Sequence, residues 1–322
     1  MNMSFRAIVL VLLVGLLLFV ASACLWDEET LAAEKSRFPG IEEILLGVFP
    51  RHSREFHLWR EKRCRAALTA DPSQIALYDD LAVSLHKLGD HDGAITVMLS
   101  KEKLRPGLYE TYSNLGTFHI YKNQLPQAIE WIDKALEINS NAHFGRERYQ
   151  KWLVEWTMAG KPNAEVALGE GSINPFGFSR FVFEKSGIVS VSGANESRLP
   201  ALQGILGMMR FADYDNPLLL EAAGDVLLCG EFESNAAHLA CMAYWQAFQN
   251  TADPAEKIRL SGKCKQAQNT IDGFVAKTFQ SNLAKGLARG KALNEKVRAD
   301  ELAWISENKD ASAEFSEKYL KP

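Results

Sequence analysis

The sequence predicts an all-α protein, an α-α superhelix of stacked antiparallel helix pairs followed by a helical C-terminal region. Three observations lead to this class. Residues 78–82 match residues 112–116, and residues 94–95 match residues 128–129, both at an offset of 34 residues. Capping residues followed by proline, as in Asp253-Pro254, mark helix starts. Apolar residues recur every three or four positions over long stretches, which is the spacing of one helix face.

The N-terminus, residues 1–23, is predicted to be a signal peptide. An apolar run from Ala7 to Val20 is too short for a confident transmembrane helix, and Ala21-Ser22-Ala23 then leads to Cys24. This ending resembles the lipobox of bacterial lipoproteins, in which the cysteine carries lipid and anchors the protein to a membrane. Ala21-Ser22-Ala23 is equally a plain cleavage site, so a soluble secreted protein is the alternative.

Residues 24–160 are assigned to a repeat domain. Small side chains let two helices approach closely, and large ones fill the space between their turns. The matched positions are Tyr78, Leu81, Ala82, Leu85, Ala94 and Met98 in one unit and Tyr112, Leu115, Gly116, Ala128, Ile132 and Ala135 in the next. This pattern resembles the tetratricopeptide repeat, a helix–turn–helix unit of 34 residues. The chain departs from the family at Lys101, which replaces Ala, and at His119, which replaces a large aromatic residue.

The resemblance implies a right-handed solenoid whose concave groove binds a partner protein. The first-helix positions that face this groove in the family correspond to Ala76, Asp79, Val83, His86, Glu110, Ser113, Thr117 and Ile120. This mixed, partly acidic set suits an extended peptide or a partner helix with basic and apolar residues. One family variant grips a terminal carboxylate with Lys and Asn at the positions of Asp79 and Val83, so we expect no such clamp. The alternative is a solvated spacer.

Residues 161–200 are predicted to be a linker or irregular segment, because Gly169-Glu170-Gly171-Ser172 and Asn174-Pro175 are turn formers. A short helix over 178–185 is favoured there over a hairpin. Residues 201–322 are assigned to a helical C-terminal domain. It begins with a hairpin that resembles a degenerate tetratricopeptide unit, whose packing positions are Leu220, Gly224, Leu227, Ala237, Ala240 and Tyr244.

A long basic helix is predicted from Pro254 onward, with Gly286 and Gly290 expected to break or bend it. Residues 257–298 contain ten Lys or Arg residues and two acidic residues. This charge favours a face that binds an anionic partner such as lipid head groups or an acidic protein. The alternative is the solvated face of a helix that caps the solenoid.

Composition limits the functional classes. The chain has 36 basic and 40 acidic residues, so its net charge does not favour nucleic-acid binding. It contains five cysteines. Cys24 aside, we expect Cys64, Cys229, Cys241 and Cys264 to be free buried thiols, with a Cys229–Cys241 disulfide as the alternative.

Three common catalytic or metal-binding motifs are missing from the sequence. It contains no H-E-x-x-H zinc motif, no phosphate loop of the G-x4-G-K-[ST] type and no G-x-S-x-G nucleophile turn. His86 and His91 lie five positions apart across a turn, which favours a surface role over a metal site. We therefore predict a non-catalytic protein with no cofactor, no metal and no small-molecule substrate.

The function predicted from these features is an exported scaffold or adaptor at the bacterial cell envelope. It would bind a protein or peptide in its groove, as its similarity to bacterial tetratricopeptide lipoproteins implies, and would reach the membrane through Cys24. Two alternatives stay open. One is an enzyme with an unrecognised active site in residues 165–322, which a pocket of converging polar side chains would favour. The other is a structural envelope protein that associates with itself.

Overall fold

The computed structural model describes residues 27–28, 30, 33, 36–141, 145–163, 175–187, 191–229 and 235–320. These residues are helical with short connections, and no strand occurs among them, which confirms the all-α superhelix. The predicted signal peptide, residues 1–23, and Cys24 lie outside the described residues. Within the described ranges, no helix combines the length and the apolar character that a membrane crossing requires.

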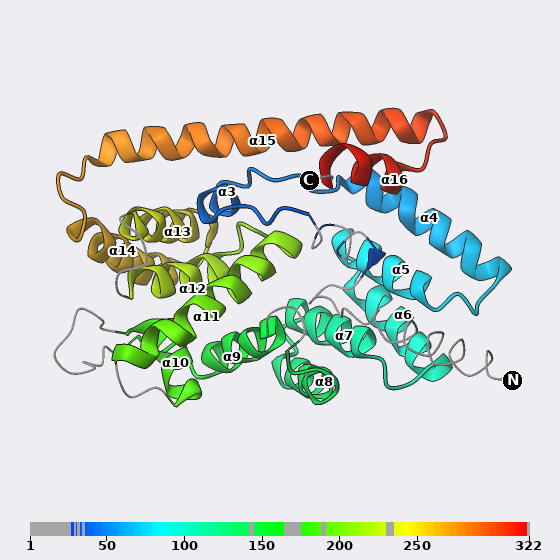
Figure 1. Ribbon diagram of the computed structural model, residues 1–322, viewed down its shortest axis with the longest axis horizontal. Helices are drawn as coiled ribbons and strands as arrows, with labels where there is room; N and C mark the ends of the chain where they lie inside the picture. Colours follow the sequence, from blue (N-terminus) through cyan, green and yellow to red (C-terminus); the bar gives the residue numbers. More distant parts are fainter. Residues whose placement is uncertain are drawn as a thin grey trace, which may run out of the picture.

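The helices follow one another in adjacent, packed pairs (Figure 1). Those of the described residues are α3 (Ile41–Leu45), α4 (Arg54–Ala70), α5 (Ala76–Lys87), α6 (His91–Leu104), α7 (Tyr109–Tyr121), α8 (Leu125–Ile138), α9 (Arg146–Met158), α10 (Gly177–Ser186), α11 (Val191–Phe211), α12 (Pro217–Leu228), α13 (Ala236–Asn250), α14 (Pro254–Asn269), α15 (Ala276–Ser306), α16 (Ala311–Phe315) and the π-helical turn η2 (Ser316–Leu320).

The two matched sequence units form the hairpins α5–α6 and α7–α8. Each helix from α4 to α9 packs on the next one along the chain. Ala94, Ala128 and Ile132 are completely buried at the crossings. A Cβ atom added to Gly116 would lie 2.6 Å from Cγ1 of Ile132, so a glycine lets α7 and α8 approach this closely.

Helices α9 to α14 share the largest apolar core. Tyr149, Leu153 and Trp156 of α9 belong to this core, although their residues fall within the range assigned to the repeats. Helix α9 packs on α8 but also on α10 and α11. The segment 161–200 contains α10 and the start of α11, and α10 confirms the short helix expected over 178–185.

The predicted break in the long basic helix was wrong. The chain turns at residues 270–275, where Gly273 has a φ of 65°, and α15 then continues without interruption through Gly286 and Gly290. Gly286 and Gly290 instead lie where α15 packs closely against Leu46. A Cβ atom at Gly290 would lie 2.2 Å from the backbone oxygen of Leu46, and one at Gly286 would lie 2.6 Å from its Cδ1. Both glycines therefore let α15 lie against residues 46–47.

Helix α15 closes the solenoid into a ring. In Figure 1 it runs from the end of α14 back to α4 and α16, and it packs on both of the latter. Glu301 of α15 is completely buried. It accepts a hydrogen bond from the backbone N–H of Ser53 at 2.9 Å, and its Oε1 lies 2.6 Å from Nδ1 of His52. Helix α3 lies inside the ring against α11 and α13.

Candidate functional site

The residues predicted to face the groove do not form one open surface. Asp79, Val83, His86, Ser113 and Thr117 are all at most 4% exposed. The other members are Ala76, which is exposed, and Glu110 and Ile120, which are half-buried. Their role in binding stays a prediction, because burial here shows only what each side chain contacts within the chain.

Two unusual residues of the first repeat form a pair. Lys101 stands where the family has Ala, and its Nζ donates to Oδ2 of Asp79 at 2.5 Å. Nδ2 of Asn114 lies 3.4 Å from Oδ1 of the same carboxylate. Burial raises the pKa of Asp79 to about 7, although the charge of Lys101 opposes the rise. Asp79 is therefore held between helices rather than turned to a partner.

His86 and Ser113 are likewise used within the helix layer. Nδ1 of His86 lies 3.1 Å from Nδ1 of His91, and its ring packs against Phe118 and Tyr121. Burial holds the pKa of His86 well below its usual range, with the charges of Lys87 and His91 adding to the effect. The hydroxyl of Ser113 contacts Oε1 of Glu147 at 3.3 Å.

Thr117 and Ile120 line an apolar pocket on the side of α7 that faces α9 and α12. This apolar pocket has a volume of about 100 Å³. Its walls come from α7, α9, the end of α11 and the start of α12, and they include Thr117, Ile120, Leu153, Met208, Phe211 and Leu218. Ile120, Phe211 and Leu218 are only half-buried, so apolar surface is open at this point.

Residues 211–216, between α11 and α12, are tied to the repeats. Nζ of Lys87 donates to the backbone oxygens of Phe211 at 2.9 Å and Ala212 at 2.8 Å. The hydroxyl of Tyr121 donates to Oδ2 of Asp213 at 2.7 Å. These bonds span 92 or more positions of sequence. The loop thereby forms a wall between the apolar pocket and a second cavity.

The second cavity is larger and polar, with a volume of about 340 Å³. This polar cavity is enclosed by residues from five parts of the chain: the N-terminal segment at residues 27, 30 and 33, residues 49–57, helix α5, residues 210–215, and the C-terminal Phe315 and Leu320. Val83 of the predicted groove set faces it. The cationic side chains Arg51, Arg54, Lys87 and Arg210 line it together with His52 and His57.

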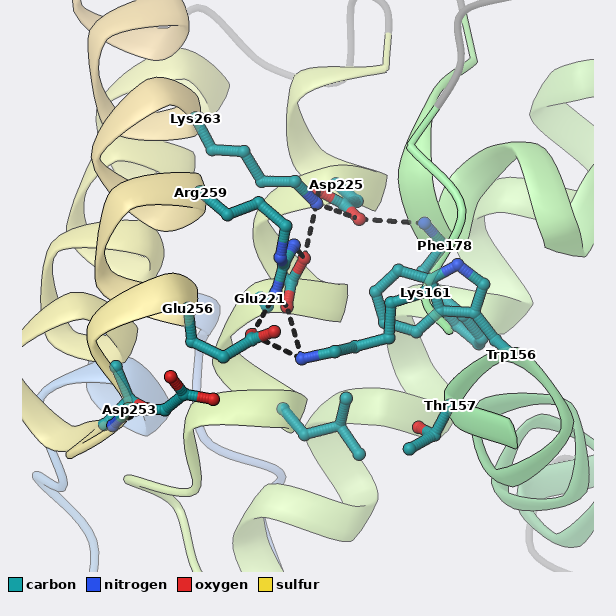
Figure 2. Close-up of polar contacts among 12 residues, drawn as sticks. Trp156, Thr157, Lys161, Phe178, Glu221, Asp225, Asp253, Glu256, Arg259 and Lys263 are labelled. Atoms are coloured by element: carbon teal, nitrogen blue, oxygen red, sulfur yellow. Dashed lines mark hydrogen bonds and ion pairs between the residues drawn. The ribbon is translucent and has the colours of Figure 1, made fainter. Parts of the chain in front are cut away.

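A cluster of six charged side chains lies where α10, α12 and α14 meet (Figure 2). Nζ of Lys263 donates to Oε1 of Glu221 and to Oδ1 of Asp225, both at 2.6 Å. Arg259 pairs with Glu221 and Glu256, and Lys161 pairs with Glu256. Lys263, Glu221 and Asp225 are each at most 2% exposed.

The two buried carboxylates of this cluster, Asp225 and Glu221, differ in their partners and in the direction of their pKa shifts. Asp225 also accepts hydrogen bonds from the hydroxyl of Tyr244 and the backbone N–H of Phe178, each at 2.8 Å. Burial raises the pKa of Asp225, and nearby Lys263 opposes the rise. Burial acts in the same way on Glu221, but the hydrogen bond from Arg259 and the charge of Lys263 lower its pKa. Three cations meet three carboxylates, so the cluster joins the helices that carry them.

The remaining sequence-based candidates are distributed over the surface and the core. Arg259 and Lys263, counted in the basic stretch, belong to the buried cluster, whereas Lys265, Lys277, Lys285 and Arg289 are exposed. Cys64, Cys229, Cys241 and Cys264 are buried and free, as expected. Among the described residues, no group of three His, Cys, Asp or Glu side chains could hold a metal ion.

The wall of the polar cavity contains the residues that the sequence does not single out. His57 lies on α4, Lys87 on α5 and Phe211 at the end of α11, and the hydrogen bond from Lys87 to Phe211 joins parts that are 124 positions apart. The dipeptide Asn216-Pro217 marks the helix start beside the loop, but no pattern links that loop to α5.

No family model matches the chain, and no curated protein matches it either.

Proposed function

We propose that the protein is a non-catalytic scaffold of the bacterial cell envelope that binds an apolar side chain of a partner peptide or helix. The observation that carries this proposal is the apolar pocket between α7, α9 and α12. Half-buried apolar residues at its mouth include Ile120 and Leu218. Exposed apolar concavities of this kind are typical anchoring points for a partner's side chain.

The charge beside the pocket restricts the partner. Asp213 and Asp215 are exposed on the loop between the apolar pocket and the polar cavity, and they line the polar cavity. Acidic groups around an apolar pocket favour a partner in which basic residues flank an apolar one. This agrees with the partner chemistry that the sequence predicts.

The proposed site can be tested with Ile120→Arg, which places a charge at the mouth of the apolar pocket. A partner that co-purifies from envelope extract with the wild type should be lost or strongly reduced. Ile258→Arg is the matched control, because Ile258 is 77% exposed on α14, far along the chain from the pocket. If Ile120→Arg stays folded by circular dichroism and retains the partner as well as Ile258→Arg does, the pocket is not the binding site.

Export and lipidation of Cys24 belong to the same proposal. Asp27, three positions after Cys24, is 4% exposed, and its Oδ2 accepts a hydrogen bond from Nη2 of Arg60 at 2.8 Å. Oδ1 of Asp80 accepts one from the backbone N–H of Glu28 at 3.1 Å. Three residues of chain span at most about 11 Å. A lipid on Cys24 would therefore hold the first repeat close to the membrane surface.

The lipid can be tested directly. Cys24→Ser is expected to release the protein into the soluble fraction or to block its maturation. Mass spectrometry of the N-terminal peptide measures the modification. Unchanged membrane association together with an unmodified Cys24 would contradict lipidation.

Two other functions remain as alternatives. An enzyme with its active site in residues 165–322 would need polar groups free to react, and the carboxylates Glu221 and Asp225 are held in ion pairs with Arg259 and Lys263. A self-associating envelope protein would show a mass in solution that rises with concentration, whereas an adaptor of this kind would stay monomeric. Analytical ultracentrifugation over a hundredfold range of concentration separates these two.

A further inference from the structure

The polar cavity contains two cations that feel nearby carboxylates without direct contact: Asp213 and Asp27 act on Lys87, and Asp215 and Asp213 act on Arg51. Two of the three N–H groups of Lys87 donate to the backbone oxygens of Phe211 and Ala212, which carry no formal charge. Arg51 donates to the backbone oxygen of Gly47 at 3.1 Å, and its guanidinium stacks 4.2 Å from the ring of Tyr214. Neither cation forms an ion pair within the described residues. Lys87 keeps a third N–H for another acceptor.

A buried imidazole beside these cations also lacks a partner. His57 is 7% exposed, and its Nδ1 makes no hydrogen bond within the described structure. Burial holds the pKa of His57 well below its usual range, and nearby His52 and Lys87 add to this effect. The ring is therefore neutral and can place its hydrogen on Nδ1 as a donor. An unmatched donor at the wall of a cavity indicates a missing acceptor.

The acids at the cavity limit the charge that it can accept. Asp27 is engaged by Arg60 and by the backbone N–H of Thr30 at 2.8 Å. Asp213 accepts the hydroxyl of Tyr121. Asp215 is exposed at the edge. These carboxylates would repel a ligand with several negative charges, whereas one negative charge fits between Lys87 and Arg51.

Part of the wall is apolar. Val83, Phe49, Phe315 and Leu320 border the cavity. Its volume of about 340 Å³ falls in the range of small-molecule sites. A ligand that fits this wall has an apolar body and a single polar end.

We propose that the polar cavity binds a small organic monocarboxylate, with its carboxylate between Lys87, Arg51 and His57 and its apolar body against Val83, Phe315 and Leu320. This site is separate from the apolar pocket, so it stands whether or not the scaffold function is correct. The sequence predicts no small-molecule substrate, and the proposed molecule is a ligand that the protein holds without converting it.

Isothermal titration calorimetry on the purified protein with benzoate and hexanoate tests the proposal. Both acids are expected to bind, while benzamide and hexanamide, which have the same shapes and no charge, bind at least tenfold more weakly. Inorganic phosphate is the third probe. Equal binding of acid and amide, tighter binding of phosphate, or no binding of either acid at millimolar concentration would each overturn the proposal.

Substitutions in the wall of the polar cavity test whether the acid binds there. Lys87→Met removes the charge and keeps the length, and it is expected to weaken benzoate binding at least tenfold. Lys103→Met, on the exposed side of α6, is the matched control and should bind as the wild type does. Ala33→Leu fills the cavity without touching Lys87 and should also abolish binding, which covers the case in which Lys87→Met fails to fold. Wild-type affinity in folded Lys87→Met or in Ala33→Leu would place the acid elsewhere.

Discussion

The repeat helices α5–α8 and the helices α10–α14 bury charge in different ways. In the repeats, one ammonium, that of Lys101, meets one carboxylate, that of Asp79. Between α12 and α14, Lys263 meets two carboxylates, and one of these also binds Tyr244 and the backbone of Phe178. A single pair can be replaced as a unit, whereas each member of the cluster supports several others.

The surroundings of the two ammonium groups account for this difference. Lys101 occupies a position where small residues bring two repeat helices together, so the space admits one partner. Around Lys263 lie the rings of Trp156, Phe176 and Tyr244, at 5.7 to 5.8 Å from Nζ. Rings at this distance attract a cation but provide no counter-charge, and two carboxylates supply it. A packed helical hairpin can therefore bury an ammonium group when enough carboxylates lie close to it to balance its charge.

Lys263→Met is expected to have the largest effect, a loss of about 3–5 kcal/mol in the free energy of unfolding. It would leave Asp225 and Glu221, which are 0% and 1% exposed, without the ammonium that they share. Urea denaturation measures the loss. Lys265→Met, two positions along α14 and exposed, is the matched control and should change stability by less than about 0.5 kcal/mol. Similar values for the two variants would mean that the cluster does not stabilise the fold.

Lys101→Ala introduces the residue that the tetratricopeptide pattern, which the sequence resembles, has at this position, yet it is expected to cost about 2–3 kcal/mol at pH 8. The reason is that Asp79 would stay buried without the ammonium that it pairs with, and at this pH either keeping or neutralising its charge costs free energy. Adding Asp79→Asn should recover more than half of the loss, because the remaining amide carries no charge. Urea denaturation of the wild type, both single variants and the double variant measures this coupling. Strictly additive effects would contradict a direct pair.

The loss in Lys101→Ala should shrink at lower pH. Burial raises the pKa of Asp79 to about 7 in the folded chain, and the variant lacks the cation that opposes this rise. An unfolded Asp titrates at about 3.9. Between these values the folded state holds a proton that the unfolded state has released, so stability increases as the pH falls from 8 to 5. The same loss at both pH values would contradict the raised pKa.

The repeats can be predicted from sequence because their packing is local. Gly116 and Ile132 meet within one hairpin, and the period of 34 residues places their counterparts in the neighbouring unit. Ring closure cannot be predicted in this way. His52 and Glu301 are 249 positions apart, and no periodicity relates them. The contact depends on the summed curvature of all the helices between them.

The candidate sites are only partly accessible to the same reasoning. Motif position selects Thr117 and Ile120, which line the apolar pocket, but it selects Asp79 and Ser113 equally, and these turn to neighbouring helices. The sequence marks Lys101 as unusual without naming its partner. The position of a residue in a repeat predicts which helix face it lies on. Whether its side chain is open to a ligand or contacts a neighbouring helix depends on its own chemistry.

Gly290→Ala is expected to weaken the closure that joins the two regions, with a loss of about 2 kcal/mol. Its Cβ would lie 2.2 Å from the backbone oxygen of Leu46, and backbone atoms cannot move aside as a side chain can. Gly286→Ala is the comparison, because its Cβ would meet the flexible end of Leu46, and alanine favours the helix by about 1 kcal/mol. Urea denaturation should find Gly286→Ala close to the wild type. The reverse order would mean that α15 is held differently.

The smallest expected effect concerns the four buried thiols. Burial raises the pKa of Cys64, Cys229 and Cys241 to about 11 and that of Cys264 to about 12. The thiol form is therefore favoured in the folded state, and its contribution to stability is complete below the unfolded pKa of about 8.5. That contribution is lost as the pH rises from about 9 through the folded values, because the unfolded chain releases these protons first.

Labelling with iodoacetamide, followed by mass spectrometry of each cysteine, compares the accessibility of the thiols in the two regions. At pH 8 the folded protein should react far more slowly than the protein in urea, since the thiolate is the reactive form. Cys64, at 4% exposure, lies on α4 at the end of the repeats and lines a surface cavity, whereas Cys229 and Cys241 are completely buried in the core of the second region. Cys64 should therefore be labelled first. If Cys241 reacts before Cys64, the second region opens more readily than the repeats.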